Sequence, residues 1–337
     1  MPAKTALIFG VTSQDGSYLA DLLLEKSYRV VGVMRRTTDY NRVNVQHLRG
    51  RIEFDFADLS DFAAISSAIS KHRPDEIYNI AAQSVPADSW NRVLETGDVT
   101  GLGPVRVLEA ARRFAPEARV YQASSREIYG GVETEVVDER SPMAANNPYG
   151  CAKLFAHQMI AVYRDSYGLF ACGGVLFNHE SPRRSLHFVT RKITLAAACI
   201  ARGAKSPPLD ELGRPLVENG RMKLGNLDAM RDWGYAPEYV EAMWRMLQQP
   251  KPRDFVIATN TLHSVADFAE AAFAALDLDW RKHVVEDELL KRPTEIAASR
   301  GDYSLATKEL GWKPKTFFPD LAKLMARADA EAVTAAV

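Results

Sequence analysis

The stretch Lys4-Thr5-Ala6-Leu7-Ile8-Phe9-Gly10-Val11-Thr12-Ser13-Gln14-Asp15-Gly16 decides the fold. Its apolar first half predicts a short buried strand, residues 10–16 predict a glycine-rich turn, and an apolar helix is expected at 17–26. This order is typical of a dinucleotide-binding site, because the turn lets the backbone approach a pyrophosphate and the helix N-terminus offers N–H groups. Ser13 replaces the middle glycine of Gly-x-x-Gly-x-x-Gly, so we expect an intact turn with altered phosphate contacts. The alternative is an ordinary turn between a strand and a helix.

A second strand is expected at 29–34, and it ends in Arg35-Arg36. An acidic residue at this position would bind a ribose 2′-hydroxyl, whereas arginine suits a 2′-phosphate. The pair therefore predicts NADP rather than NAD. The alternative is a solvated pair of loop arginines.

Strand and helix patterns alternate through the first half of the chain. Further strands are expected at 52–54, 76–80, 119–123 and 170–176, and helices at 62–71, 101–114 and 149–167. Such alternation predicts an α/β fold with a doubly wound parallel sheet of the Rossmann type. We expect this domain to span 1–177, with a later segment returning near 225–258. A smaller, mixed C-terminal domain at 178–337 would bind the substrate.

Composition excludes several classes of function. The 337 residues carry a formal net charge of −1, which argues against a nucleic-acid surface. No segment has the roughly 18 apolar residues of a membrane span, and the start lacks a signal-peptide pattern. The three cysteines, Cys151, Cys172 and Cys199, have no metal-ligand spacing, so no metal site is expected. A reducing cytoplasm is the expected compartment.

Polar residues follow the predicted strands at the edge where ligands bind in parallel sheets. They are Asp58, the run Ala81-Ala82-Gln83-Ser84 and the run Ser124-Ser125-Arg126-Glu127. The segment Pro148-Tyr149-Gly150-Cys151-Ala152-Lys153 adds a tyrosine and a lysine four residues apart, which share one face of a helix. A neighbouring ammonium group would lower the tyrosine pKa from about 10 and make it a usable base.

These motifs resemble the extended short-chain dehydrogenase/reductases, and longer strings resemble the GDP-mannose 4,6-dehydratase family within them. The resemblance runs from about residue 4 to about residue 317. The strings are Gln-Asp-Gly-Ser-Tyr-Leu-Ala at 14–20, Leu-Phe-Asn-His-Glu-Ser-Pro-Arg-Arg at 176–184, Phe-Val-Thr-Arg-Lys at 188–192, Arg-Asp-Trp-Gly at 231–234, Tyr-Val-Glu-Ala-Met-Trp at 239–244 and Leu-Gly-Trp-Lys-Pro at 310–314.

The resemblance implies a hydro-lyase that oxidises a GDP-hexose at C4, eliminates water across C5–C6 and returns hydride to C6. Tyr149 would remove the C4 hydroxyl proton, with Lys153 lowering its pKa. Glu127 would act as the C5 base, and the Ser125 hydroxyl would bond near the C4 oxygen. It also implies a homodimer formed through paired helices, or a tetramer completed by the loop at 35–42.

Pattern and resemblance together predict two sets of binding residues. For NADP they are Gly10, Thr12, Ser13, Gln14, Asp15, Gly16, Arg35, Arg36, Asp58, Leu59, Ala81, Ala82, Gln83, Tyr149, Lys153, His179 and Arg184. For the nucleotide sugar they are Ser84, Ser125, Glu127, Asn178, Lys192, Arg231, Arg292 and Glu295.

Three features depart from the family pattern. Arg126 stands where a small Ser is usual; turned inward it would pair with Glu127, but strand alternation predicts that it points outward. The irregular stretch at 205–219 is longer than usual, and Met230 replaces a lysine. Two other functions therefore stay open: an NADP-dependent nucleotide-sugar epimerase or 4-keto reductase, and a nucleotide-binding regulatory protein with a dead site. An epimerase acting only at C4 would need no base in the position of Glu127.

Overall fold

A seven-stranded parallel sheet forms the centre of the molecule. The computed structural model describes residues 3–36, 42–291 and 298–334. In spatial order the strands are β12 (Phe255–Ile257), β7 (Ala171–Leu176), β5 (Arg119–Ala123), β4 (Glu76–Asn79), β1 (Thr5–Phe9), β2 (Arg29–Met34) and β3 (Glu53–Phe56). The six expected strands are confirmed to within two residues. The sequence did not predict β12, a three-residue edge strand that pairs with β7.

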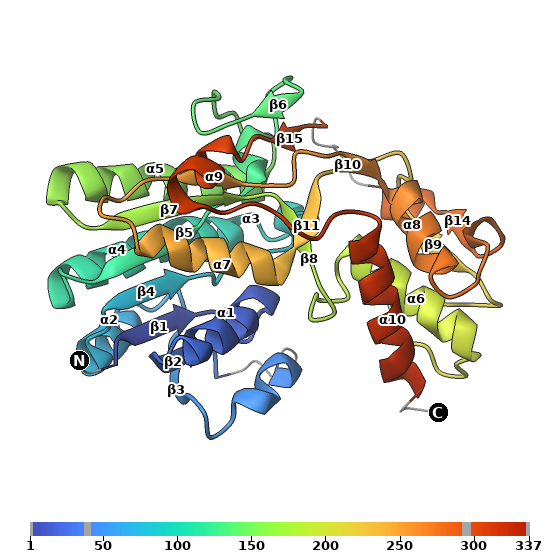
Figure 1. Ribbon diagram of the computed structural model, residues 1–337, viewed down its shortest axis with the longest axis horizontal. Helices are drawn as coiled ribbons and strands as arrows, with labels where there is room; N and C mark the ends of the chain where they lie inside the picture. Colours follow the sequence, from blue (N-terminus) through green and yellow to red (C-terminus); the bar gives the residue numbers. More distant parts are fainter. Residues whose placement is uncertain (1–2, 37–41, 292–297, 335–337) are drawn as a thin grey trace.

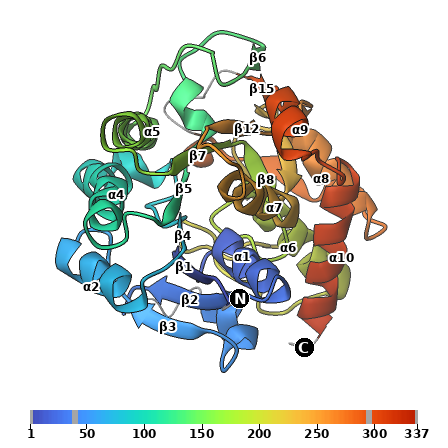
Figure 2. The same ribbon diagram turned by 60° about the vertical axis from the view of Figure 1, so that its left-hand side comes forward.

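Helices cover both faces of this sheet (Figure 2), which confirms the doubly wound α/β fold. One face packs against α1 (Gln14–Glu25), α7 (Ala236–Leu247) and α9 (Ser304–Leu310). The other packs against α2 (Phe62–His72), α4 (Gly103–Phe114) and α5 (Pro148–Tyr167). Chain segments on both sides of residue 177 therefore build the sheet layer.

A group of helices and short strands lies beside the sheet (Figure 1), and its buried side chains form a separate hydrophobic cluster. It joins α6 (Val189–Arg202), α8 (Val265–Ala274) and α10 (Asp320–Thr334) to the short strands β9 (Met222–Leu224) and β14 (Val284–Glu286). Asp329 of α10 is almost fully buried against α6, where it accepts hydrogen bonds from Thr194 and Arg191, each at 2.6 Å. We propose that this cluster is the core of the smaller domain.

Short elements connect the two parts. Three further strand pairs are β6 (Val136–Val137) with β15 (Arg300–Gly301), β8 (Asn178–Glu180) with β11 (Trp233–Tyr235), and β10 (Met230–Arg231) with β13 (His263–Ser264). The short helical segments are η1 (Arg42–Leu48), η2 (Asp88–Trp90), α3 (Val93–Glu95), η3 (Thr96–Leu102), η4 (Arg126–Tyr129), η5 (Trp280–Lys282) and η6 (Glu288–Leu290). Of these strands, β8 and β11 pair in parallel, and β8 follows directly after the end of β7.

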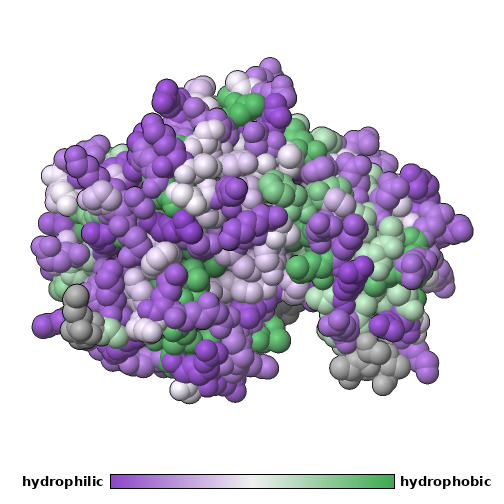
Figure 3. Space-filling model, viewed as in Figure 1, coloured by the Kyte–Doolittle hydropathy of each residue, from purple (hydrophilic) through white to green (hydrophobic). Residues whose placement is uncertain are grey.

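Figure 3 shows the molecular surface from the same direction as Figure 1; this face is mainly hydrophilic, with scattered hydrophobic areas. Within the three described ranges, none of the helices has the length and hydropathy needed to cross a bilayer.

Candidate active site

The glycine-rich turn between β1 and α1 is tightly closed. Gly10 has a φ of +88°, and a Cβ atom on Gly16 would lie 2.3 Å from the carbonyl oxygen of Gly10. Neither position can carry a side chain without moving backbone. Ser13 caps α1 by accepting a hydrogen bond from the Gly16 N–H at 3.0 Å. The serine therefore keeps the turn intact, and it occupies one N–H group of the helix start.

A cleft of about 340 Å³ opens above this turn, at the carboxyl ends of the sheet strands. Most of the residues predicted to bind the cofactor line it: Gly10, Thr12, Ser13, Gln14, Asp15, Arg35, Asp58, Leu59, Ala81, Ala82, Gln83 and Arg184. Arg36 instead places its guanidinium carbon 5.1 Å from the centre of the Phe56 ring. Of the two adjacent arginines, Arg35 is thus the one that borders the cleft.

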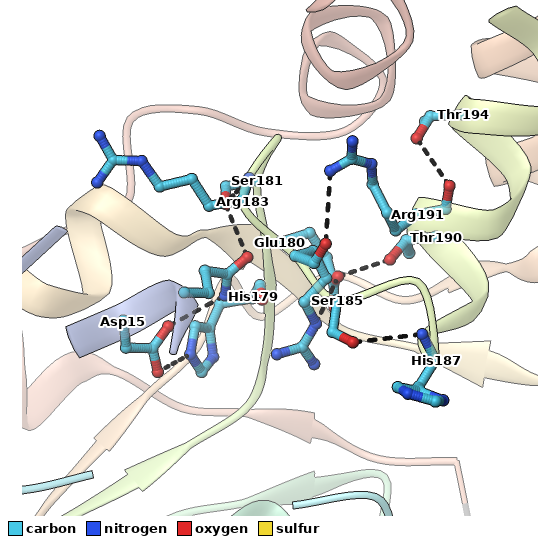
Figure 4. Close-up of polar contacts among 12 residues, drawn as sticks. Asp15, His179, Glu180, Ser181, Arg183, Ser185, His187, Thr190, Arg191 and Thr194 are labelled. Carbon is cyan, nitrogen blue, oxygen red and sulfur yellow. Dashed lines mark hydrogen bonds and ion pairs between the residues drawn. The ribbon is translucent and has the colours of Figure 1, made fainter. Parts of the chain in front are cut away.

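Asp15 and His179 form a buried ion pair at the border of the cleft (Figure 4), with 2.8 Å between Nε2 of His179 and Oδ2 of Asp15. Burial acts to raise the pKa of Asp15, but the nearby His179 outweighs it, so the Asp15 pKa lies below its usual value. The pKa of His179 is correspondingly raised by Asp15 against the effect of burial. The pair fixes the start of α1 to the segment that follows β7.

A second cleft, of about 130 Å³, contains the four residues predicted to be catalytic. Ser125 and Glu127 come from the turn after β5, and Tyr149 and Lys153 come from the first turns of α5. Asn178 and His179 also line it. The two clefts share Asp15, Ala82, Ser84 and Arg184, so they adjoin each other.

The electrostatics of Tyr149 differ from the expectation. Burial raises the pKa of Tyr149, the charge of Glu127 raises it further, and a hydrogen bond with Ser125 only partly opposes this. Burial also lowers the pKa of Lys153 to about 8. Lys153 Nζ donates to the carbonyl oxygen of Ala123 at 2.8 Å and lies 5.7 Å from the centre of the Tyr149 ring. Sequence spacing shows that the two side chains are neighbours, but it does not show how strongly both are desolvated.

Glu127 is buried and is held by a residue that the sequence analysis overlooked. Asn147 caps α5 and donates from Nδ2 to Oε2 of Glu127 at 2.7 Å. An Asn directly before a Pro at the first helical position is a recognisable helix-start signal. The contact with Glu127 had no such signal, because it depends on tertiary structure.

Arg126 does not point outward into solvent as expected. Its side chain is 4 % exposed, and Nη2 donates to the Ser299 hydroxyl at 2.7 Å. The expectation was wrong because it used the alternation of an extended strand, whereas the chain enters a helical turn directly after Ser125.

The predicted substrate residues are only partly brought together. Ser84, Ser125, Glu127 and Asn178 line the second cleft. Neither Lys192 nor Arg231 is among the described residues that line the two clefts. Nζ of Lys192 lies 2.5 Å from Oε1 of Glu211, in the irregular stretch at 205–219, and Arg231 donates to the carbonyl of Met230. Arg292 and Glu295 lie outside the described residues.

In the part of the chain that the structure describes, no three His, Cys, Asp or Glu side chains are grouped as metal ligands. The polar side chains that line the two clefts instead include hydroxyls, amides, carboxylates and arginines, together with His179, Tyr149 and Lys153.

Comparison with known proteins agrees with this geometry. The family model described as GDP-mannose 4,6 dehydratase matches residues 7–325. The chain belongs to this family. GDP-mannose 4,6 dehydratase 1 of Arabidopsis thaliana is 41% identical over 342 residues, covering 98% of this chain and 91% of the relative. The GDP-mannose 4,6 dehydratase of Homo sapiens is 40% identical over 357 residues, covering 98% and 92%.

Solved structures support the fold assignment of this GDP-mannose 4,6-dehydratase family member. The dTDP-glucose 4,6-dehydratase of Streptomyces venezuelae, solved with NAD bound, aligns with a TM-score of 0.81. It is 21% identical and covers 97% of each chain.

Proposed function

We propose that this chain dehydrates GDP-D-mannose to GDP-4-keto-6-deoxy-D-mannose. The reaction loses one water and needs no net oxidant, because the hydride removed from C4 returns to C6. One observation supports this most directly: a buried carboxylate, Glu127, shares a cleft with Tyr149 and Lys153. A C4 epimerase would need the tyrosine but no carboxylate beside it. Family membership supports the choice of GDP-mannose.

A nicotinamide dinucleotide fits the first cleft. The tightly closed glycine turn allows close backbone approach, and the cleft adjoins the one that contains Tyr149. A nicotinamide dinucleotide held there would supply transient hydride storage between C4 oxidation and hydride return to C6. Arg35 at the rim would pair with a 2′-phosphate, so we propose NADP as the cofactor.

Tyr149 would remove the C4 hydroxyl proton while Ser125 donates a hydrogen bond to the same oxygen. The raised pKa of Tyr149 means that the protein alone keeps the phenol protonated at neutral pH. Lys153, with a pKa of about 8, supplies a positive charge near the ring at neutral pH. To act as a base, the tyrosine would first have to release its phenol proton to solvent, which the positive charges of Lys153 and of a bound oxidised nicotinamide ring would favour.

Glu127 would perform the elimination. A ketone at C4 acidifies the C5 proton, so a carboxylate is a strong enough base to remove it. The proton would then be delivered to the departing C6 hydroxyl, which leaves as water. The same side chain would thus serve as base and acid, on one face of the hexose.

Cationic side chains are proposed to hold the diphosphate, since arginine and lysine suit phosphate oxygens. Lys192, Arg231 and Arg292 would have this role, with Asn178 and Glu295 contacting the sugar or base. In the structure Lys192 pairs with Glu211. A diphosphate bound to Lys192 would therefore take the place of the Glu211 carboxylate.

Incubation with a panel of nucleotide hexoses tests the proposed function. GDP-mannose should give a product lighter by one water, with a 6-methyl signal and a C4 carbonyl in the NMR spectrum. An isomer of unchanged mass would show an epimerase instead. Unaltered substrates throughout the panel would contradict both activities.

Changing Arg35 and Arg36 to Ala is expected to weaken NADP binding much more than NAD binding. The reason is that only NADP has the 2′-phosphate for which the arginines would supply charge. Dissociation constants measured by fluorescence quenching would test this. Because Arg35 borders the cleft and Arg36 lies against Phe56, the Arg35 variant alone should account for most of the loss. Equal losses for the two cofactors would show that the 2′-phosphate is not read here.

We also propose a homodimer, with a tetramer favoured. Large hydrophobic side chains are exposed along α3, η3, α4 and α5, on the sheet layer: Val93, Leu94, Leu102, Phe114, Phe155, Val162 and Tyr167. Light scattering at micromolar concentration should give at least twice the chain mass. A monomer under these conditions would contradict the proposal.

A further inference from the structure

We propose that Asn147 is a positioning residue that fixes where the Glu127 carboxylate stands relative to Tyr149. The inference rests on the proposed function, and it assigns a role in elimination to a residue that touches neither the hexose nor the cofactor in the proposed mechanism.

One side-chain amide makes two different contacts. Oδ1 of Asn147 accepts a hydrogen bond from the Gly150 N–H at 2.8 Å, which caps α5. Nδ2 donates to Oε2 of Glu127 at 2.7 Å. Asn147 is 8 % exposed, so both contacts are shielded from water. The amide therefore links the start of the helix that carries Tyr149 to the carboxylate proposed as the base.

The cap alone does not require asparagine. Serine, threonine and aspartate cap helices about as well. Aspartate would place a second carboxylate against Glu127, and serine has a shorter side chain with a single proton. Only asparagine combines an acceptor for Gly150 with a fixed N–H group for Glu127. The contact with Glu127, rather than the helix cap, therefore distinguishes asparagine from the other cap residues.

The contact leaves one carboxylate oxygen available. Of the two carboxylate oxygens of Glu127, only Oε2 accepts a hydrogen bond from a described residue, which is Asn147. The backbones are also in close contact, because a Cβ atom on Gly150 would lie 2.7 Å from the carbonyl oxygen of Glu127. With Oε2 anchored and the two backbones packed, Oε1 remains to take the C5 proton.

Other charged and titratable groups share the cleft with Glu127. They are Tyr149 and Lys153 from α5, Asp15 from α1, His179 and Arg184 from the segment after β7, and Arg126 from the same turn. None of these changes identity in an Asn147 variant. A shift in pH dependence in such a variant would therefore report the amide contact.

Two variants separate positioning from capping. Asn147→Ser keeps a helix cap but shortens the donor. We expect C5 deuterium incorporation from heavy water, with GDP-mannose as substrate, to slow by about 10- to 100-fold, the usual cost of losing a hydrogen bond to a charged group.

Asn147→Asp keeps the cap and adds a like charge. The acid limb of its rate profile for elimination should move up by about one pH unit or more, because two neighbouring carboxylates resist joint ionisation. Reduction of bound cofactor by GDP-mannose should remain in both.

Asp61→Ala is the matched control. Asp61 caps α2 in the same way, by accepting from the Ala64 N–H at 3.0 Å. Its loss should lower the melting temperature without moving the acid limb. Asn147 variants with the wild-type acid limb and wild-type deuterium entry would overturn the inference, as would equal slowing of cofactor reduction and elimination. If the wild-type protein makes no 6-deoxy product, the proposed function is contradicted. That result is obtained before any variant is made, so it is distinguishable from failure of the positioning role.

Discussion

Replacement of Glu127 by Gln is expected to stop the reaction after C4 oxidation. Gln keeps the size and hydrogen-bonding reach of the side chain but has no basicity. Loss of water should slow by roughly 10²- to 10⁴-fold, which is the usual contribution of a general base. Tyr149 and Lys153 are unchanged, so the variant mixed with GDP-mannose should accumulate reduced cofactor. Dihydronicotinamide absorbance and product mass measure the two steps separately.

Glu135→Gln is a suitable control, because Glu135 is an exposed glutamate that pairs with Arg300 and lines neither cleft. It should behave as the wild type in both steps. If Glu127→Gln turns over at the wild-type rate with solvent deuterium still entering at C5, another group is the base. Arg126 would then be the first residue to substitute in the search for the reason, since its buried guanidinium belongs to the same turn.

Replacement of Tyr149 by Phe is expected to block the reaction one step earlier. The ring and its packing remain, but no group is left to take the C4 hydroxyl proton. Cofactor reduction by GDP-mannose should fall by roughly 10²- to 10⁴-fold. Stopped-flow absorbance measures this directly, without waiting for product.

Tyr163→Phe offers a matched control on the same helix. Tyr163 is buried and donates to Glu109 of α4 at 3.1 Å, and it is not among the residues lining either cleft. Its loss should leave cofactor reduction unchanged. Cofactor reduction in Tyr149→Phe at the rate of Tyr163→Phe would remove the tyrosine from the proposed mechanism.

The sequence predicts the strands and helices that carry the site residues well, because these elements depend on local patterns. Continuous apolar runs identified β1 and β2, and parallel strands bring their carboxyl ends to one edge. Ser125 and Glu127 follow β5, and Tyr149 and Lys153 are one helical turn apart, so their meeting in one cleft followed from topology. The edge strand β12 was missed because three apolar residues give no periodic signal.

The details that failed depend on tertiary burial. The pKa of Tyr149 is raised rather than lowered, since burial acts on it more strongly than any neighbouring charge. Arg126 turned into the protein where the strand ended. The contacts of Asn147 with Glu127 and of Lys192 with Glu211 join residues 20 and 19 positions apart that belong to different elements or loops. Patterns within one element cannot report such pairs.

The buried carboxylate of Asp329 sets an order of events during biosynthesis. Arg191, its partner on α6, also donates to the carbonyl oxygens of Pro182 and Arg184, beside the catalytic cleft. A nascent chain that has not yet reached residue 329 has a guanidinium in this place without the carboxylate that compensates it. The ion pair that compensates Arg191 can therefore form only after the ribosome has delivered α10, although every residue proposed to carry out chemistry has been synthesised long before.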